Sequence, residues 1–491
     1  MAATSPPEQL AEALVLIEQL RAENEQLRAE NEALRDRVAR LDSEMGRNSE
    51  NSSKPPAADP IGPRQSRAER RANARSAVRR QGKQPGAPGA HLEAREPDVV
   101  VEHAPVSCRC CGKDLTGAEV VGEVRRQVID IPPVRPVVTD HVAQRRRCAC
   151  GTETVADFPS EARAPVCWGP EVRAFGLYLL DRQHLPVERT AELLADLLDA
   201  PVSTGWLCLL QQEAAGKLVP FMACLKERLG SEPVVHADET GTRVRTTRHW
   251  VHTLTTNLLT LLAVHPRRGI EAINDIGVLP AYTGTIVHDG WASYDLFADA
   301  THAQCGAHLL RHLSDVGETP AFAIWTAQMI GVLLGAKLAS EAAAAAGLGK
   351  VGTRTAAELR GRYHATLDVA LALLPAGAPP RRRHSGGWNN AQRKAWNLAT
   401  RMRNDADQVL RLLDDTRVPF DNNTAERSLR MVKLHDKISG CFFSINGAQA
   451  FADVRSYIQT AASHGENRLA VLRQLFTDGP WLPPPRAAGG T

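Results

Sequence analysis

Apolar residues recur every seven positions near the N-terminus of the chain. One position of the repeat is held by leucines, at Leu20, Leu27, Leu34 and Leu41. The partner position holds two asparagines among apolar residues, at Leu10, Ile17, Asn24, Asn31 and Val38. Asn within such a seam fixes the register of a two-stranded coiled coil at some cost in stability. We therefore predict a leucine-zipper coiled coil over residues 8–46 that pairs two chains; a single amphipathic helix packed on its own protein is the alternative.

Helical periodicity returns over residues 165–230. A helix over 186–198 is followed by a break at 199–203, and a second helix starts at Ser203 or Thr204. This order of elements is typical of a helix-turn-helix, and equally of a small helical bundle. The second helix has few side chains that could read base edges, so DNA reading by this segment is one of two interpretations.

Strand periodicity dominates residues 231–315. Five short apolar runs predict strands, at residues 232–237, 250–256, 258–264, 284–288 and 303–305. Helices are expected near 269–276 and 292–298. Three strands followed by mixed strand and helix are typical of an α/β domain.

After this domain the composition becomes helical again. Residues 316–415 are rich in Ala and Leu and form a predicted all-α insertion, with a basic break at 379–387. Helices resume over 416–478, and the Pro- and Gly-rich tail over 479–491 is expected to be disordered. The predicted fold class of the whole chain is multidomain α+β.

Size and composition agree with several soluble domains. The 491 residues correspond to about three domains of ~150 residues each. Hydrophobic residues make up 43% of the chain, enough for large cores, and the formal net charge is +3. No apolar run approaches the ~20 residues of a membrane span, and the N-terminus is too acidic for a signal peptide. We expect a soluble, cytoplasmic protein with no membrane partner.

Residues 47–98 form a basic segment rich in Pro and Gly. Asn51-Ser-Ser-Lys-Pro-Pro56 and Gln84-Pro-Gly-Ala-Pro-Gly89 are loop-forming sequences. The arginines between them are candidates for nucleic-acid binding: Arg67, Arg70, Arg71, Arg75, Arg79 and Arg80. Such arginines displace counterions from DNA phosphates, but a solvated, disordered linker has the same composition. Both interpretations stay open, and a linker that orders on DNA satisfies both.

Five of the ten cysteines lie within residues 108–150. Cys108 and Cys111 form a C-x2-C knuckle, and Cys148 and Cys150 supply two further thiolates. Four sulfurs complete the tetrahedral shell of a structural zinc ion. Between the two pairs, β-branched residues predict strands that bring the pairs together. We therefore predict a small zinc-binding β module over residues 99–160, with unligated buried cysteines as the alternative.

Three segments far apart in the chain each deliver one acidic residue. Val234-Val-His-Ala-Asp-Glu-Thr240 and Thr285-Ile-Val-His-Asp-Gly-Trp291 predict strands that end in Asp238 and Asp289. Because side chains alternate along a strand, Asp238 and Glu239 face opposite sides of the sheet. Glu239 becomes the candidate if the strand is offset by one residue. Taken singly, each Asp is also explained as an ordinary cap or turn residue.

The third segment, Asp421-Asn-Asn-Thr-Ala-Glu-Arg-Ser-Leu-Arg430, starts a predicted helix that carries Glu426. A surface pair with Arg430, four residues further on, is the ordinary explanation of Glu426. Carboxylates that converge from different elements are what divalent metal ions need for phosphoryl transfer. The stretch between Asp289 and Glu426 is too long for a bare loop.

Taken together, these features resemble the IS66 family of insertion-sequence transposases, which belongs to the DDE superfamily and has an RNase H-like catalytic domain. The likeness runs in order through the zipper, the linker motif, the four-cysteine finger, the helical segment, the split catalytic domain and the C-terminal helices. By this resemblance the first acid is Asp238, the second is Asp289 and the third is Glu426. Cys305-Gly-Ala-His308, with Arg311, also resembles the family's segment after the second acid.

The resemblance implies a catalytic core over 231–315 and 416–478. Its three acids would hold two Mg²⁺ (or Mn²⁺) ions and catalyse cleavage of DNA ends and strand transfer. Phosphate contacts are predicted for the basic residues beside the third acid, which are Arg427, Arg430 and Lys433. The expected partners are the terminal inverted repeats of the element, target DNA, a second copy of the chain and accessory proteins of the same element. The expected location is the bacterial cytoplasm, at the nucleoid.

Two other functions fit the same residues. A zinc-containing DNA-binding protein derived from a transposase would bind DNA without catalysis. A metal-dependent nuclease would cleave DNA without joining it. Metal-dependent nicking of end-containing DNA separates the first from a transposase, and a strand-transfer assay separates the second.

Overall fold

The computed structural model describes residues 92–159, 161–379 and 387–485. The predicted coiled coil and the six arginines of the basic segment lie outside the described residues, so both stay predictions. The chain divides into two units, Met1–Val128 and Ile129–Thr491. The described part of the first unit is a short stretch that contains the first pair of clustered cysteines.

The strands expected between the two pairs of cysteines are largely missing. β1 (Arg145–Arg147) and β2 (Glu153–Val155) form an antiparallel hairpin around the second pair. Residues 118–144, all of them described, contain no strand. Val121 and Val124 in this stretch are more than 90% exposed. With no apolar surface to pack against, β-branched composition alone does not build a strand there, so this part of the prediction is wrong.

The segment predicted to be helical over 165–230 is helical. Its elements are α3 (Pro170–Leu177), the π-helical turn η2 (Tyr178–Arg182), α4 (Val187–Leu198), α5 (Thr204–Lys217) and α6 (Val219–Gly230). Ser203 caps α5, because its Oγ accepts the N–H of Trp206 at 3.1 Å. The predicted break and capped second helix are therefore confirmed.

The second unit contains a five-stranded mixed sheet. Its strands are β3 (Val234–Val244), β4 (Thr247–Thr255), β5 (Thr260–His265), β6 (Thr285–His288) and β7 (Thr301–Gln304). Their order is β5-β4-β3-β6-β7, with β4 antiparallel to both β3 and β5 and with β6 and β7 parallel to β3. All five predicted strands are present.

One strand runs further than the sequence predicts. Asp238 does not end β3, because the strand continues for six more residues to Val244. Antiparallel pairing with β4 extends over this whole part, from His236 to Val244. The parallel partner β6 pairs no further than His236. The hairpin thus holds β3 extended where the apolar pattern stops, and Asp238 lies inside a strand.

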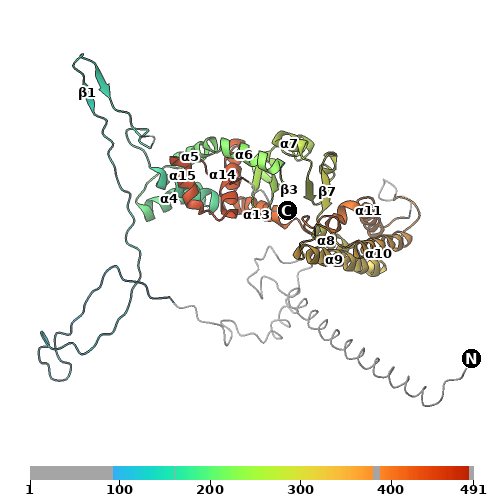
Figure 1. Ribbon diagram of the computed structural model, residues 1–491, viewed down its shortest axis with the longest axis horizontal. Helices are drawn as coiled ribbons and strands as arrows, with labels where there is room; N and C mark the ends of the chain where they lie inside the picture. The colour runs from blue at the N-terminus through green and yellow to red at the C-terminus, as the bar shows by residue number, and fades with distance from the viewer. Residues whose placement is uncertain (1–91, 160, 380–386, 486–491) are drawn as a thin grey trace, which may run out of the picture. The chain divides into compact units, whose positions relative to one another are not determined.

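Helices cover both faces and one edge of the sheet. α7 (Ile270–Ile276) packs on the face that carries Val235 and Ala237, and α13 (Asn423–Ile438) lies against the other. α14 (Ile445–Ser463) lies along β5, and Figure 1 shows it with α5 and α6 beside the sheet. Three polar side chains of α14, those of Gln449, Ser456 and Thr460, accept backbone N–H groups of β5. The backbone N–H groups on the outer edge of β5 therefore find their hydrogen-bond acceptors on a helix.

The all-α insertion follows β7. Its elements are α8 (Gly306–Gly317), η5 (Pro320–Phe322), α9 (Ala323–Ala345), α10 (Thr353–Ala372), α11 (Asn390–Asn404), α12 (Ala406–Val409) and η6 (Arg411–Leu413). They bury one apolar cluster of their own, which includes Trp325, Met329 and Tyr363. Figure 1 shows these helices on the side of the sheet where β7 lies.

One helical stretch is more apolar than the sequence analysis expected. Pro320–Ala345 is long enough to cross a membrane, with a mean hydropathy of 1.5, by length and composition alone. The core helix of a soluble protein passes the same test, so one such stretch is weak evidence. Trp325 and Met329 on this stretch are fully buried within the insertion. Its apolar residues are therefore used in part for packing between helices.

The chain ends with α15 (Arg468–Thr477) and an extended segment. Residues 479–485, which the sequence places in the tail, lie against the second unit. The N–H of Trp481 donates to the hydroxyl of Tyr457 at 2.9 Å, and Arg228 donates to the carbonyl of Pro484. This part of the tail is therefore anchored to α14 and α6.

Candidate active site

Asp238 lies in β3, the central strand of the sheet, and Asp289 directly follows the neighbouring strand β6. In the parallel register, His236 of β3 lies opposite Val287 of β6. Asp238 and Asp289 each follow two residues after this pair. Continuing the register therefore places the two carboxylates beside each other at the carboxyl end of β6. Ligands of α/β sheets gather at this edge.

Asn422 fixes the start of the helix that carries Glu426. Its side chain is buried against β3, where Nδ2 donates to the carbonyl of Ala237 at 2.9 Å. Its Oδ1 lies 2.8 Å from Nδ1 of His236, and because Oδ1 can only accept, the imidazole donates. The backbone N–H of Asn422 donates to Sγ of Cys305 at 3.2 Å. Glu426 follows in the first turn of α13 and faces the same side of the sheet as Asp238.

The three acids act on one another electrostatically. The pKa of Asp238 is raised to about 7, mainly by burial, with smaller contributions from the nearby charges of Glu239, Asp289 and Glu426 and an opposing effect of the hydrogen bond from the backbone N–H of Glu239. A carboxyl with this environment is stabilised in its charged form by a cation. The donor set, three carboxylates from three elements, is the kind that Mg²⁺ and Mn²⁺ bind. The residues present therefore fit a divalent metal ion.

Glu426 has other neighbours than the sequence predicts. Its Oε1 lies 3.3 Å from Nη2 of Arg311 and 3.7 Å from Nδ1 of His308, both on α8. Among the described residues, no ion pair joins it to Arg430, so the ordinary surface pair is not formed. Ligand atoms of Cys305, His308 and Glu426 all lie within 4.8 Å of one another. Burial lowers the pKa of His308, which leaves a neutral imidazole beside the acids.

Glu239 faces away from this group. Its carboxylate accepts Nε of Arg268 at 2.7 Å and the hydroxyl of Tyr294 at 2.7 Å. The side chain is only 1% exposed. Because both oxygens already have partners on the opposite face, the geometry favours Asp238 over Glu239 as a metal ligand.

The basic residues of α13 differ in their surroundings. Arg427 and Arg430 are exposed, and no ion pair holds either of them within the part of the chain that the structure describes. Lys433 donates to the carbonyl of Gly241 on β3. Its ammonium is thus engaged with the sheet, whereas the two arginines are available to a phosphate backbone.

The clustered cysteines lie in two tight turns. In the first, the N–H of Gly112 donates to the carbonyl of Cys108 at 2.9 Å, and hydrogen bonds from Cys111 and Cys110 lower the pKa of the Cys108 thiol. In the second, the N–H of Gly151 donates to the carbonyl of Cys148 at 2.9 Å. Gly112 and Gly151 have φ of +72° and +89°, which suits glycine at the end of a turn.

The thiol of Cys150 in the second turn is also acidified. Hydrogen bonds with Thr152 lower its pKa to about 7. Thiolates are the form that binds zinc. Each turn by itself therefore has the chemistry of a zinc knuckle.

A second group of side chains that could bind a metal ion includes His288, the residue before Asp289. Ligand atoms of His288, Asp295 and His302 lie within 4.8 Å of one another. Nδ1 of His288 accepts the N–H of Gly290 at 3.2 Å, so neutral His288 carries its proton on Nε2. With Nδ1 engaged by Gly290 and Nε2 protonated, His288 has no free ring nitrogen to bind a metal ion. The tautomer therefore argues against metal binding by these three residues.

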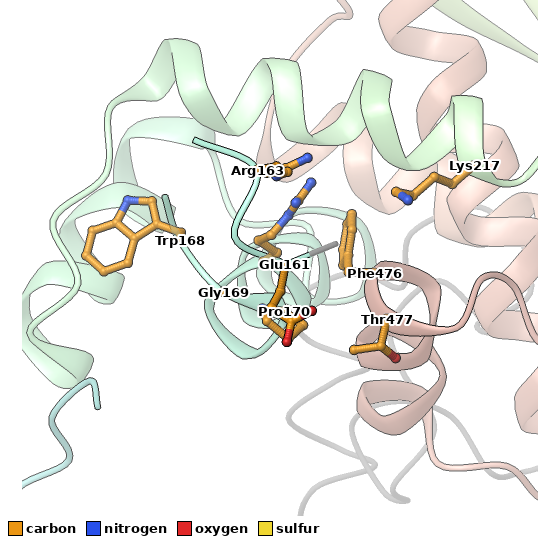
Figure 2. A pocket seen from close by; sticks show the side chains of 9 residues that line it. Glu161, Arg163, Trp168, Gly169, Pro170, Lys217, Phe476 and Thr477 are labelled. Atoms are coloured by element: carbon orange, nitrogen blue, oxygen red, sulfur yellow. The ribbon is translucent and has the colours of Figure 1, made fainter. Parts of the chain in front are cut away.

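A small pocket lies elsewhere in the second unit (Figure 2). It has a volume of about 70 Å³ and lies at the start of α3. Figure 2 shows Arg163, Lys217 and Thr477 around the ring of Phe476. None of the three acids lines it. This pocket is therefore separate from the three acids.

Several residues around the acids escaped the sequence analysis as site residues. Asn422 and His236 lie within the quoted motifs; His236 is polar between the apolar Val235 and Ala237, which was an available signal, whereas Asn422 stands among polar residues. Arg268 and Tyr294 lie in loops, and no spacing links them to Glu239. Their role becomes visible once the sheet brings the loops together.

Comparisons with known families agree with this geometry. Residues 165–450 match the family described as Transposase IS66 family, which covers both the sheet and the insertion. Residues 105–151 match the zinc-finger binding domain of transposase IS66, which includes both cysteine turns. Residues 3–93 match a family of unknown function, DUF6444.

A search of curated proteins finds no match. The first of the family matches extends over more than half of the chain, from the helical segment before the sheet to α14 after the third acid. The chain therefore belongs to the IS66 family of transposases.

Proposed function

We propose that this transposase cleaves the ends of its own insertion sequence and joins them to target DNA, with Asp238, Asp289 and Glu426 as the catalytic acids. The observation that carries the proposal is the convergence of the three carboxylates from β3, the end of β6 and α13. The strand order β5-β4-β3-β6-β7, with β4 antiparallel to its neighbours, supports an RNase H-like catalytic core. The insertion would then separate the second acid from the third.

The three acids would hold Mg²⁺ or Mn²⁺. When bound, two such ions activate the attacking oxygen and stabilise the leaving oxygen in an in-line displacement at phosphorus. Other residues of the chain would position the acids and balance their charge. Arg311 neutralises part of the charge on Glu426 across their 3.3 Å contact. Asn422 and His236 hold the start of α13 on β3, which keeps Glu426 near Asp238.

DNA would be the substrate and the main partner. Arg427 and Arg430 are exposed beside the third acid and suit contacts with phosphates, and Lys433 contributes positive charge from the next turn. The six arginines of the basic segment would add contacts outside the described residues. Pairing through the predicted zipper would let two chains hold two element ends, with accessory proteins of the same element as further partners.

We also propose that Cys108, Cys111, Cys148 and Cys150 together hold one structural zinc ion. Four thiolates form the closed shell typical of structural zinc. The family match over residues 105–151 and the lowered pKa values of Cys108 and Cys150 support this assignment. The finger would stabilise the region between the basic segment and the helices.

The test is metal-dependent cleavage of DNA that carries the element's terminal repeats. Asp238→Ala, Asp289→Ala and Glu426→Ala should each lower the cleavage rate by a factor on the order of 10³ or more, because bound metal supplies several kcal/mol to the transition state. Asp299→Ala is the control, since Asp299 is an exposed acid in the loop after β6. Retained cleavage in any of the three variants would remove that residue from the site.

Two outcomes with the unchanged protein would favour the other functions. DNA binding without cleavage, in Mg²⁺ and in Mn²⁺, would indicate a DNA-binding protein derived from a transposase. Cleavage without joining in a strand-transfer assay would indicate a nuclease.

A further inference from the structure

A buried polar network lies behind the candidate acids, on the face of β3 opposite Asp238. Its centre is Glu239, whose carboxylate is 1% exposed. Arg268 reaches it with Nε at 2.7 Å and Nη2 at 2.5 Å, and the hydroxyl of Tyr294 reaches its other oxygen at 2.7 Å. Buried carboxylates are costly unless they are paired and hydrogen-bonded. Both oxygens of Glu239 meet this condition.

One partner of Glu239, Tyr294, comes from the loop that carries Asp289, and the other, Arg268, comes from the loop between β5 and α7. Tyr294 lies five residues after Asp289, and its ring packs edge-on against Trp291 with centroids 5.7 Å apart. Trp291 donates its backbone N–H to Oδ1 of Asp289 at 2.9 Å. The guanidinium of Arg268 lies over the ring of Trp291, 4.3 Å from its centroid. Both partners of Glu239 thus lead to the residue that fixes the Asp289 carboxylate.

This loop has little other regular structure to hold it. Between the end of β6 and the start of β7, the structure has one short 3-10 turn, Tyr294–Leu296. Ladder hydrogen bonds of the sheet therefore do not fix Asp289, which follows the last residue of β6. The network around Glu239 provides a rigid link from β3 to the loop instead.

We propose that Glu239 is a positioning residue, which sets the Asp289 carboxylate beside Asp238 through Arg268, Tyr294 and Trp291. The inference rests on the proposed function, because it assumes that Asp238 and Asp289 bind metal together. β3 then carries one acid itself and orients its neighbours from both faces. Asn422 holds the helix of Glu426 on one face, and Glu239 holds the loop of Asp289 on the other.

A purely structural role for Glu239 predicts a different result. If Glu239 only stabilised the fold, its loss would lower the melting temperature and leave metal affinity unchanged. If it positions Asp289, its loss weakens metal binding in protein that is still folded. Partners that orient metal ligands typically change metal affinity by about 10- to 100-fold when they are mutated.

The experiment measures Mn²⁺ binding to the full-length, zinc-loaded protein by the loss of the free-ion electron paramagnetic resonance signal, together with the Mn²⁺ dependence of cleavage. Glu239→Gln keeps the size of the side chain and removes its charge. It should raise the half-saturating Mn²⁺ concentration about 10-fold or more in both measurements. Tyr294→Phe should give a smaller increase, because Glu239 keeps Arg268.

Two matched controls separate positioning from stability. Tyr282→Phe removes a buried hydroxyl that donates to the carbonyl of Glu232 at 2.8 Å, in the same core but away from the acids. Glu271→Gln removes the exposed partner of Arg267, the residue next to Arg268. Both should leave the half-saturating Mn²⁺ concentration unchanged, although Tyr282→Phe lowers the melting temperature.

The outcomes distinguish this inference from the proposed function. Wild-type Mn²⁺ dependence in folded Glu239→Gln protein, with weaker binding in Asp238→Ala, overturns the positioning role and leaves the proposed function intact. Equal Mn²⁺ binding by wild type and Asp238→Ala overturns the proposed metal site, and the positioning role with it. A selective shift in Glu239→Gln and Tyr294→Phe supports both.

Discussion

The sheet and the helical insertion are held together in different ways. The insertion buries large apolar side chains, such as Trp325 and Met329, in one cluster formed by helices that follow one another in the chain. Around the sheet, buried polar groups join segments that are far apart. Asn422 reaches His236 across 186 residues, and the Glu239 carboxylate binds Arg268 and Tyr294 from two loops.

The difference indicates which region of the protein determines the positions of the acids. Apolar packing tolerates many combinations of side chains as long as volume and pattern are kept. A buried polar network tolerates few, because each donor and acceptor must meet its partner. The insertion therefore supplies a scaffold, while the surroundings of β3 set the positions of the acids. Substitutions in the two regions should separate these roles.

The largest effect on stability is expected in the insertion. Trp325 is fully buried there, and Trp325→Ala should lower the free energy of unfolding by about 3–5 kcal/mol through lost burial and a cavity. Denaturant unfolding followed by circular dichroism measures this. The half-saturating Mn²⁺ concentration of the folded variant should stay at the wild-type value. A large rise in it would show that the insertion also shapes the metal site.

Asn422→Ala is expected to cost less stability and more activity. It leaves the buried donor of His236 without its partner, at about 1–3 kcal/mol, and removes one hydrogen bond to the carbonyl of Ala237. Because α13 loses its anchor on β3, the rate of DNA-end cleavage should fall at least tenfold in protein that is still folded.

Tyr363→Phe is the matched control for Asn422→Ala. It removes one buried hydrogen bond within the insertion, from the Tyr363 hydroxyl to the carbonyl of Met402 at 2.7 Å. It should cost about 1 kcal/mol and leave cleavage unchanged. Equal losses of cleavage in the two variants would contradict the division of roles between the regions.

The smallest effect is a pH dependence of stability that arises from Asp181, in the helical segment that precedes the sheet. Burial of Asp181 raises its pKa to about 8, against weaker opposing effects of Gln211 and Arg455. Between its ordinary value and pH 8 the folded protein keeps a proton that the unfolded chain has lost, so stability falls as pH rises. The slope from this group is at most about 1.4 kcal/mol per pH unit.

Asp181→Asn should flatten this slope. Unfolding free energies of wild type and variant at pH 6.5 and pH 8 give the comparison. Buried histidines such as His184, whose pKa burial lowers to about 3, act in the opposite direction near pH 6.5, where only the unfolded chain binds their proton. Their effect is the same in wild type and variant, so it cancels in the comparison. An unchanged difference between the two pH values in the variant would show that Asp181 is not the group responsible.

Much of the architecture could be predicted from periodicity. The five strands, the helix pair around Ser203 and the helices of the insertion follow from the spacing of apolar residues. The end of β3 could not be predicted in this way, because the part beyond Asp238 is held by backbone pairing with β4 and not by an apolar pattern. The strands expected near Val121 failed for the opposite reason, since the composition was suitable and no partner surface was present.

The sequence by itself determined the three acidic segments, the four cysteines and the family, because these depend on residue types in a fixed order. Only the tertiary structure shows that Asp238 and Glu239 have different surroundings. The two are adjacent and chemically alike, and what separates them is the face of β3 on which each lies. One faces Asp289 and Glu426, and the other is bound by Arg268 and Tyr294. Contacts of this kind join residues distant in sequence, and no local pattern encodes them.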